Sequence, residues 1–112
     1  MSLPRVALLL ALFAVLPAPA TLPGAEEHPI ALAVGEHGFD PAEVAAPAGS
    51  RLRFEVTNRT AAAIEFESFE LNRERVIQPG QTVNIYVSGL QAGRYEFFDD
   101  FDQTRRGTLV VK

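Results

Sequence analysis

The sequence contains no cysteine and, beyond its amino-terminal segment, no long apolar run. Without cysteine the chain has no thiolate nucleophile, no thiol redox switch and no thiolate ligand for a metal ion. It also forms no disulfide, although many exported domains of this size depend on disulfides. We therefore expect the stability of the fold to come from sheet packing or from a bound ion.

The amino-terminal segment has the pattern of a secretory signal peptide. Arg5 precedes an apolar run of eleven residues, 6–16, and an A-x-A cleavage pattern within residues 17–20 ends at Ala20. The run is shorter than the roughly 20 residues that a membrane-crossing helix needs. We predict a signal peptide at residues 1–20, export to the periplasm or the exterior, and no bilayer insertion after cleavage. The alternative is that the segment is retained as a membrane anchor.

The 92 residues that follow the predicted cleavage position are enough for one compact domain. Residues 21–29 contain turn formers and charge without periodicity, so we expect a flexible leader that includes His28, followed by a domain at residues 30–112. The net charge of the full chain is −4, and it becomes −5 without Arg5. A negative domain is a poor match for nucleic acid or for an anionic membrane.

Short stretches in which apolar and polar residues alternate recur along the domain, separated by turn residues. In the clearest stretch, residues 51–57, the side chains of Leu52, Phe54 and Val56 share one face. No helical period competes with this pattern, which predicts an all-β antiparallel sandwich of seven or eight short strands. The expected strands are residues 30–34, 43–46, 51–57, 64–68, 73–77, 83–87, 95–98 and 108–111.

Acidic residues gather at two places in this pattern. Glu65 and Glu67 alternate with apolar residues, so both carboxylates share the polar face of one strand. Asp99, Asp100 and Asp102 lie in an expected irregular loop between the last two strands. Carboxylate oxygens suit iron, calcium or another divalent ion. Crowded carboxylates repel one another, which raises some of their pKa values, and a bound cation would relieve the repulsion.

A histidine and several arginines also lie near these acids. His37 is in a turn at residues 35–38, which a loop at the end of the sandwich could bring toward the acidic loop. The predicted metal ligands are therefore Glu65, Glu67, Asp99, Asp100, Asp102 and His37. The alternative is ordinary charge pairing with the interleaved arginines Arg73, Arg75, Arg94, Arg105 and Arg106. A guanidinium beside a cation site either competes with the metal or marks a contact with an anion or a partner.

An ordered set of short motifs resembles one known family. The motifs are Phe39-x-Pro41, Pro47-Ala-Gly49, Asn58, Glu65-Phe-Glu-Ser68, Leu71-Asn-Arg-Glu74, Pro79-Gly80, Gly93-x-Tyr95 and Gly107-x-Leu-Val110. Together they resemble the EfeO-type cupredoxin-like domains of bacterial periplasmic iron uptake, over residues 30–112. The resemblance implies a Greek-key β-sandwich of the cupredoxin type and a metal-related role in the periplasm.

The sequence departs from this family at the metal ligands. Blue-copper cupredoxins have a Cys, a His and often a Met in the loop between the last two strands, where this chain has aspartates. The resemblance therefore implies no type 1 copper site. In the fused EfeO-type domains cysteines align with Phe39 and Asp99, and a methionine aligns with Phe97. In small free-standing relatives the loop has Asp-Phe-His, where the third residue here is Asp102.

The sequence shows no catalytic signature, since neither Ser68 nor Ser88 has a histidine at a spacing that suggests a triad. We expect a domain that is not an enzyme. The prediction is an exported accessory protein that binds or hands on iron, or copper in a non-blue site, for a membrane iron permease or another uptake component. The alternative is a metal-free interaction module that docks to an envelope complex through Arg94, Arg105 and Arg106.

Overall fold

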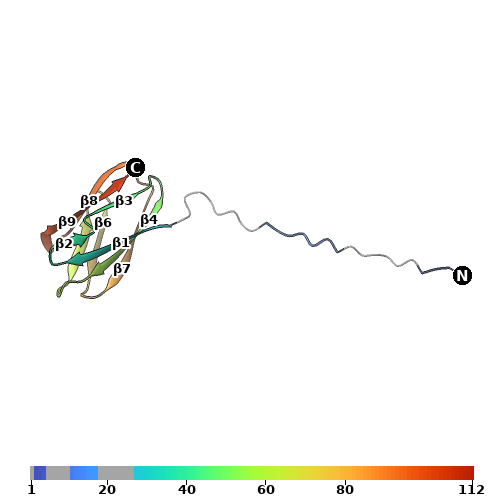
Figure 1. Ribbon diagram of the computed structural model, residues 1–112, viewed down its shortest axis with the longest axis horizontal. Helices are drawn as coiled ribbons and strands as arrows, with labels where there is room; N and C mark the ends of the chain where they lie inside the picture. The colour runs from blue at the N-terminus through green and yellow to red at the C-terminus, as the bar shows by residue number, and fades with distance from the viewer. Residues whose placement is uncertain (1, 5–10, 18–26) are drawn as a thin grey trace.

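In the part of the chain that the structure describes, nine β-strands form two sheets packed face to face (Figure 1). The computed structural model describes residues 2–4, 11–17 and 27–112 of the chain. Within these residues no helix is long and apolar enough to cross a bilayer. The strands are β1 (Glu27–Gly35), β2 (Gly38–Asp40), β3 (Glu43–Ala46), β4 (Arg51–Asn58), β5 (Ile64–Ser68), β6 (Arg73–Ile77), β7 (Thr82–Ser88), β8 (Gly93–Asp99) and β9 (Asp102–Val111).

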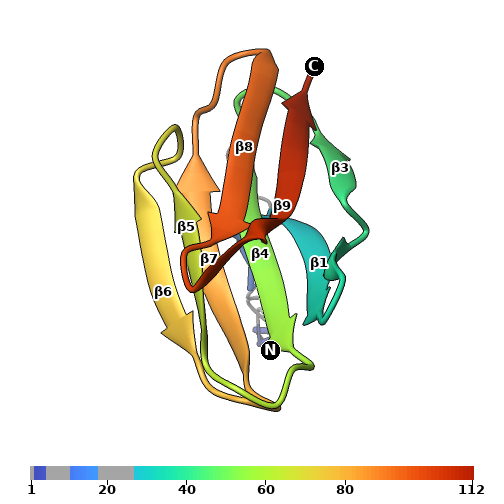
Figure 2. The same ribbon diagram turned by 90° about the vertical axis from the view of Figure 1, so that its left-hand side faces the viewer.

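The strand order is β2-β1-β4-β7 in one sheet and β3-β9-β8-β5-β6 in the other. Figure 2 shows the five-stranded sheet in front, with β7, β4 and β1 behind it. The predicted all-β sandwich is confirmed, but the expectation of purely antiparallel pairing is wrong, because β1 pairs with β4 and β3 pairs with β9 in parallel. β2, a three-residue strand inside a segment rich in turn formers, is absent from the strands that the sequence predicts.

The inward faces of the two sheets form one apolar core. Leu52, Phe54 and Val56 are buried, as the alternation in residues 51–57 predicts. Four phenylalanine rings meet at the centre. The Phe66 and Phe97 rings stack with their centroids 5.5 Å apart, the Phe54 ring lies 6.0 Å from Phe66, and the Phe39 ring lies 4.9 Å from Phe97. Such aromatic pairs add about 0.5–1.5 kcal/mol each beyond the burial of their area.

The domain begins earlier in the chain than the sequence analysis expected. β1 starts at Glu27, and its first residues pair in register with β4, Glu27 opposite Arg51 and His28 opposite Leu52. Residues 27–29 were assigned to the flexible leader, and that assignment is wrong, because backbone pairing with β4 orders them. The predicted cleavage position and leader residues 21–26 lie outside the described residues.

The acidic stretch at residues 99–106 is mostly strand rather than irregular loop. β8 ends at Asp99 and β9 begins at Asp102, so only Asp100 and Phe101 form the turn. β9 is ten residues long because it pairs with β8 on one side and with β3 on the other. The shift in register between Phe98 and Asp99 marks the point where β8 leaves regular pairing.

Gly107 allows β9 to pass close to the core. It lies opposite Phe97 in the β8–β9 pair, and a Cβ atom at this position would overlap the Phe97 ring and lie 3.0 Å from the carbonyl oxygen of Ala42. The backbone cannot yield easily here, because the neighbouring amide of Thr108 donates a 2.9 Å hydrogen bond to the same Ala42 oxygen.

We therefore predict that Gly107→Ala lowers the free energy of unfolding by about 1–3 kcal/mol, the usual cost of overpacking a core. Urea denaturation followed by circular dichroism measures it. Gly93→Ala is the matched control on β8, because its Cβ would meet only the Tyr95 ring edge at an ordinary 3.7 Å. Equal losses in the two variants would contradict the close-approach explanation.

Candidate metal site

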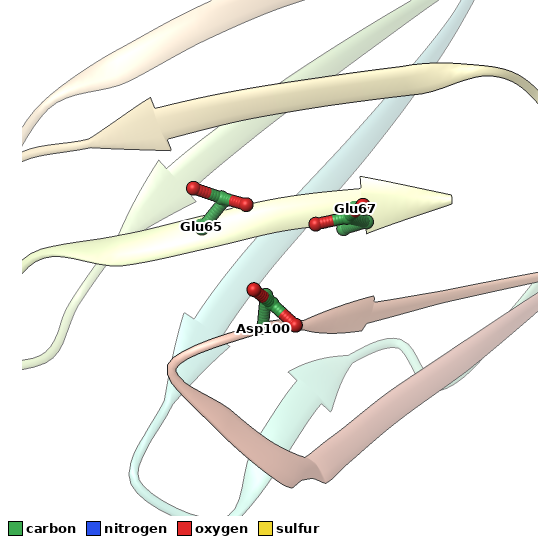
Figure 3. A group of neighbouring side chains, drawn as sticks. All are labelled: Glu65, Glu67 and Asp100. Atoms are coloured by element: carbon green, nitrogen blue, oxygen red, sulfur yellow. The ribbon is translucent and has the colours of Figure 1, made fainter. Parts of the chain in front are cut away.

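Three carboxylates converge on the outer face of the five-stranded sheet. Glu65 and Glu67 point outward from β5, since the alternating residues Ile64 and Phe66 are buried in the core. Asp100 reaches the same place from the β8–β9 turn (Figure 3). One oxygen atom of each of the three side chains lies within 4.8 Å of the others. This is a set of hard oxygen donors of the kind that calcium, magnesium and iron accept.

The backbone fixes this arrangement. β5 pairs with β8 so that Glu67 lies opposite Phe98. Beyond that pair, the amide of Asp100 donates a 2.8 Å hydrogen bond to the carbonyl oxygen of Glu65. The amide of Glu65 in turn donates to the Asp99 carboxylate at 2.9 Å. These two bonds join the start of β5 to the β8–β9 turn and hold the Glu65 and Asp100 side chains next to each other.

The site is electrostatically strained without a cation. A hydrogen bond with the carboxyl group of Glu65, followed by burial and by the charges of Asp100, Glu65 and Glu74, raises the pKa of Glu67 from 4.5 to about 7. Among residues 27–112, no arginine or lysine forms an ion pair with Glu65, Glu67 or Asp100. Near neutral pH the cluster therefore binds a proton where a metal ion could bind instead.

Asp99 is not one of the converging residues, although the sequence analysis included it. Its side chain is 0% exposed, and Arg105 Nη1 lies 3.2 Å from its Oδ2. Its Oδ1 accepts hydrogen bonds from the amides of Glu65, at 2.9 Å, and Phe101, at 3.0 Å. With three donors inside the protein, this carboxylate has a structural role.

The other two predicted ligands also lie apart from the cluster. Asp102 accepts hydrogen bonds from the hydroxyl and the amide of Thr104, which lower its pKa, with a smaller effect from Arg105. His37 lies in the β1–β2 turn and is not among the side chains whose ligand atoms converge. Gln103 is not among the residues predicted for the site, and its side-chain amide donates to Asp100 across the turn at 3.1 Å. The three-residue spacing between Asp100 and Gln103, across a turn, is the feature of the sequence that could have indicated this hydrogen bond.

The arginines take different roles. Arg94 pairs with Glu43 at 2.8 Å, and Arg106 lies over the Phe98 ring at 5.0 Å. Arg94 thus forms an ordinary charge pair, which is the alternative to a metal site that the sequence analysis describes for the arginines. The Arg105 side chain is only 16% exposed, whereas those of Arg94 and Arg106 are 65% and 50% exposed.

Comparisons with known proteins agree on the fold. A family model described as "Cupredoxin-like domain" matches residues 5–111. An uncharacterized protein of Rickettsia prowazekii is 34% identical over 83 residues, which cover 73% of this chain and 66% of the relative. The chain thus spans about two thirds of that protein's length.

Solved structures with similar folds include copper proteins. The metal-binding domain of the Cu(I)-exporting P-type ATPase CopA from Streptococcus pneumoniae, with Cu(I), matches with a TM-score of 0.71 and 19% identity, covering 83% of this chain and 91% of that one. A reduced amicyanin variant matches with a TM-score of 0.58 and 18% identity, covering 74% and 81%. At these identities the likeness extends to the fold alone.

The residues of this chain do not fit the type 1 copper site that such a fold can hold. That site needs a thiolate and imidazoles in a fixed geometry. The sequence has no cysteine, and its two histidines lie in β1 and in the β1–β2 turn, away from the carboxylate cluster. The donors that do converge are carboxylate oxygens.

The raised pKa of Glu67 gives a pH prediction. Because the native state binds this proton more tightly than the unfolded chain, the stabilisation is full below pH 4.5 and is lost as pH rises through about 7. Glu67→Gln should therefore melt like wild type below pH 4.5 and at a higher temperature than wild type above pH 7. Thermal melts at both pH values test this, with Glu36→Gln, in the β1–β2 turn, as the charge-matched control. If the melting temperature of Glu67→Gln above pH 7 exceeds that of wild type by no more than the control does, the result would contradict charge repulsion within the cluster.

Proposed function

Because this chain belongs to the cupredoxin-like domain family, we propose that it is an exported domain that binds a metal ion through Glu65, Glu67 and Asp100. The observation that supports this most is the convergence of the three carboxylates within 4.8 Å, with no arginine or lysine paired to them among the described residues. A cation at this point would remove the repulsion that raises the pKa of Glu67.

The donor set favours iron as the ion. Ferric and ferrous iron accept carboxylate oxygen, whereas Cu(I) prefers the thiolate and thioether ligands that this site lacks. Three protein oxygens leave coordination positions for water or for a ligand from a partner. Asp100 is exposed and both glutamates are half-buried, so an incoming protein could reach the ion.

We place the domain in a periplasmic iron-uptake system of the EfeO type. It would hand iron to a membrane permease or to another uptake component. The ordered sequence motifs and the oxygen ligands support this role, and the exposed position of the site suits transfer rather than storage. The ion is cargo in this proposal.

The proposed route of export makes a prediction about the mature chain. If residues 1–20 are a cleaved signal peptide, the protein recovered from the periplasm of a Gram-negative host should begin at Thr21. Intact-mass spectrometry of the periplasmic extract measures this. A chain of all 112 residues in the membrane fraction would instead support a retained anchor.

The metal site is tested by titration of the protein with iron. Ferrous iron under argon, or ferric iron as its citrate complex, should raise the melting temperature, with about 2.7 kcal/mol of stabilisation at 100 times the dissociation constant. Glu67→Gln and Asp100→Asn should each weaken the affinity about tenfold or more, which corresponds to about 1.4 kcal/mol. Affinity should rise with pH through about 7, because the metal displaces the proton on Glu67.

Glu55→Gln is the matched control for this titration, because Glu55 lies on β4 in the other sheet and pairs with Arg53 at 3.1 Å. It should bind iron as wild type does. The absence of any thermal shift with iron in wild type, or equal affinities in wild type, Glu67→Gln and Asp100→Asn, would contradict the site. A metal-free interaction module would then be the better description.

A further inference from the structure

We infer that the chain contains a second cation site, which lies at one end of the sandwich against the buried Asp99 and is filled by the chain's own Arg105 side chain. Nη1 of Arg105 lies 3.2 Å from Oδ2 of Asp99. Nε lies 3.4 Å from the carbonyl oxygen of Glu36 and 3.5 Å from Oδ2 of Asp102. The guanidinium thus lies among three oxygens from three segments: the end of β8, the start of β9 and the β1–β2 turn.

The buried carboxylate of Asp99 requires a cation beside it. The Asp99 side chain is 0% exposed and that of Arg105 is 16% exposed. The amides of Glu65 and Phe101 bind Oδ1 of Asp99, and Arg105 supplies the only charged partner of Oδ2 among the described residues. A buried carboxylate is destabilising unless an opposite charge and hydrogen bonds compensate it.

The oxygens around the guanidinium belong to the classes that bind hard metal ions. Two carboxylates and one backbone carbonyl are typical ligands of Ca²⁺. Because the guanidinium already fills the space between them, a metal ion and Arg105 cannot occupy it together. Asp99 and Asp102 thus have Arg105 as their cation, and neither is among the converging carboxylates of the outer face. The inference does not depend on the proposed iron site, which lies on the outer face of β5.

Removing the side chain of Arg105 should expose an empty cation site. We expect Arg105→Ala, in the full chain, to melt several degrees below wild type. Millimolar CaCl₂ or methylguanidinium chloride should then recover most of the lost melting temperature in a saturable way. NaCl at equal ionic strength should recover little, because screening alone does not fill the site.

The neighbouring arginine provides a matched control. The Arg106 side chain is 50% exposed, and its nearest acid is Glu96 at 3.9 Å. Arg106→Ala should melt close to wild type and should show no response to calcium or methylguanidinium beyond that of NaCl. An Arg105→Ala variant that melts like Arg106→Ala, or that recovers no more with calcium or methylguanidinium than with NaCl, would overturn the inference.

A second variant covers the case in which Arg105→Ala does not fold. The double variant Asp99→Asn with Arg105→Ala removes both charges, so it should melt above the single variant and should not respond to added cations. If the double variant instead melts below the single variant, or if calcium raises its melting temperature, then the buried carboxylate of Asp99 is not the group that requires a cation. Adding Glu67→Gln to Arg105→Ala should leave the recovery of melting temperature by calcium or methylguanidinium unchanged. This comparison tests the Arg105 site independently of the proposed iron site, so that either proposal can be contradicted without the other.

Discussion

The buried carboxylate of Asp99 lies where four segments of the chain meet. Its oxygens accept hydrogen bonds from the start of β5, from the β8–β9 turn and from Arg105 on β9, and Arg105 in turn binds the β1–β2 turn. A charge in this position is tolerable only because every one of these partners is present. The geometry of the outer surface depends on it, since the amide of Glu65 that Asp99 fixes belongs to a proposed metal ligand.

The adjacent residues Asp99 and Asp100 therefore have different roles. Asp99 faces inward and has three donors from the protein, whereas Asp100 faces outward and meets Glu65 and Glu67. The fold keeps the two-sheet architecture that it shares with copper proteins such as amicyanin, but the converging donors lie on an outer sheet face and are all oxygen. Arg105 is the charged partner of the buried Asp99, whereas the surface carboxylates of Glu65, Glu67 and Asp100 have no arginine or lysine partner among the described residues.

Sequence alone was sufficient where a short period determines the structure. The alternation of residues 51–57 predicted the buried face of β4, and the same period put Glu65 and Glu67 on one face. Prediction from the sequence failed where the structure depends on pairing between strands that are far apart in the chain. Residues 102–107 have little apolar periodicity, and Asp102, Arg106 and Gly107 join the strand through their pairs with residues 97–99 of β8. Which of Asp99 and Asp100 points inward depends on the register shift at Phe98, which no local pattern indicates.

The parallel pairing of β3 with β9 has a consequence for the order of folding. Among the described residues, residues 43–46 of β3 pair only with residues 108–111, so this strand has no partner until those residues have been synthesised. The same terminal segment brings Leu109 and Val111 into the core. Contacts between residues so far apart in the chain form slowly. Loss of residues 108–111 would therefore remove the β9 partner of β3 and part of the core at once.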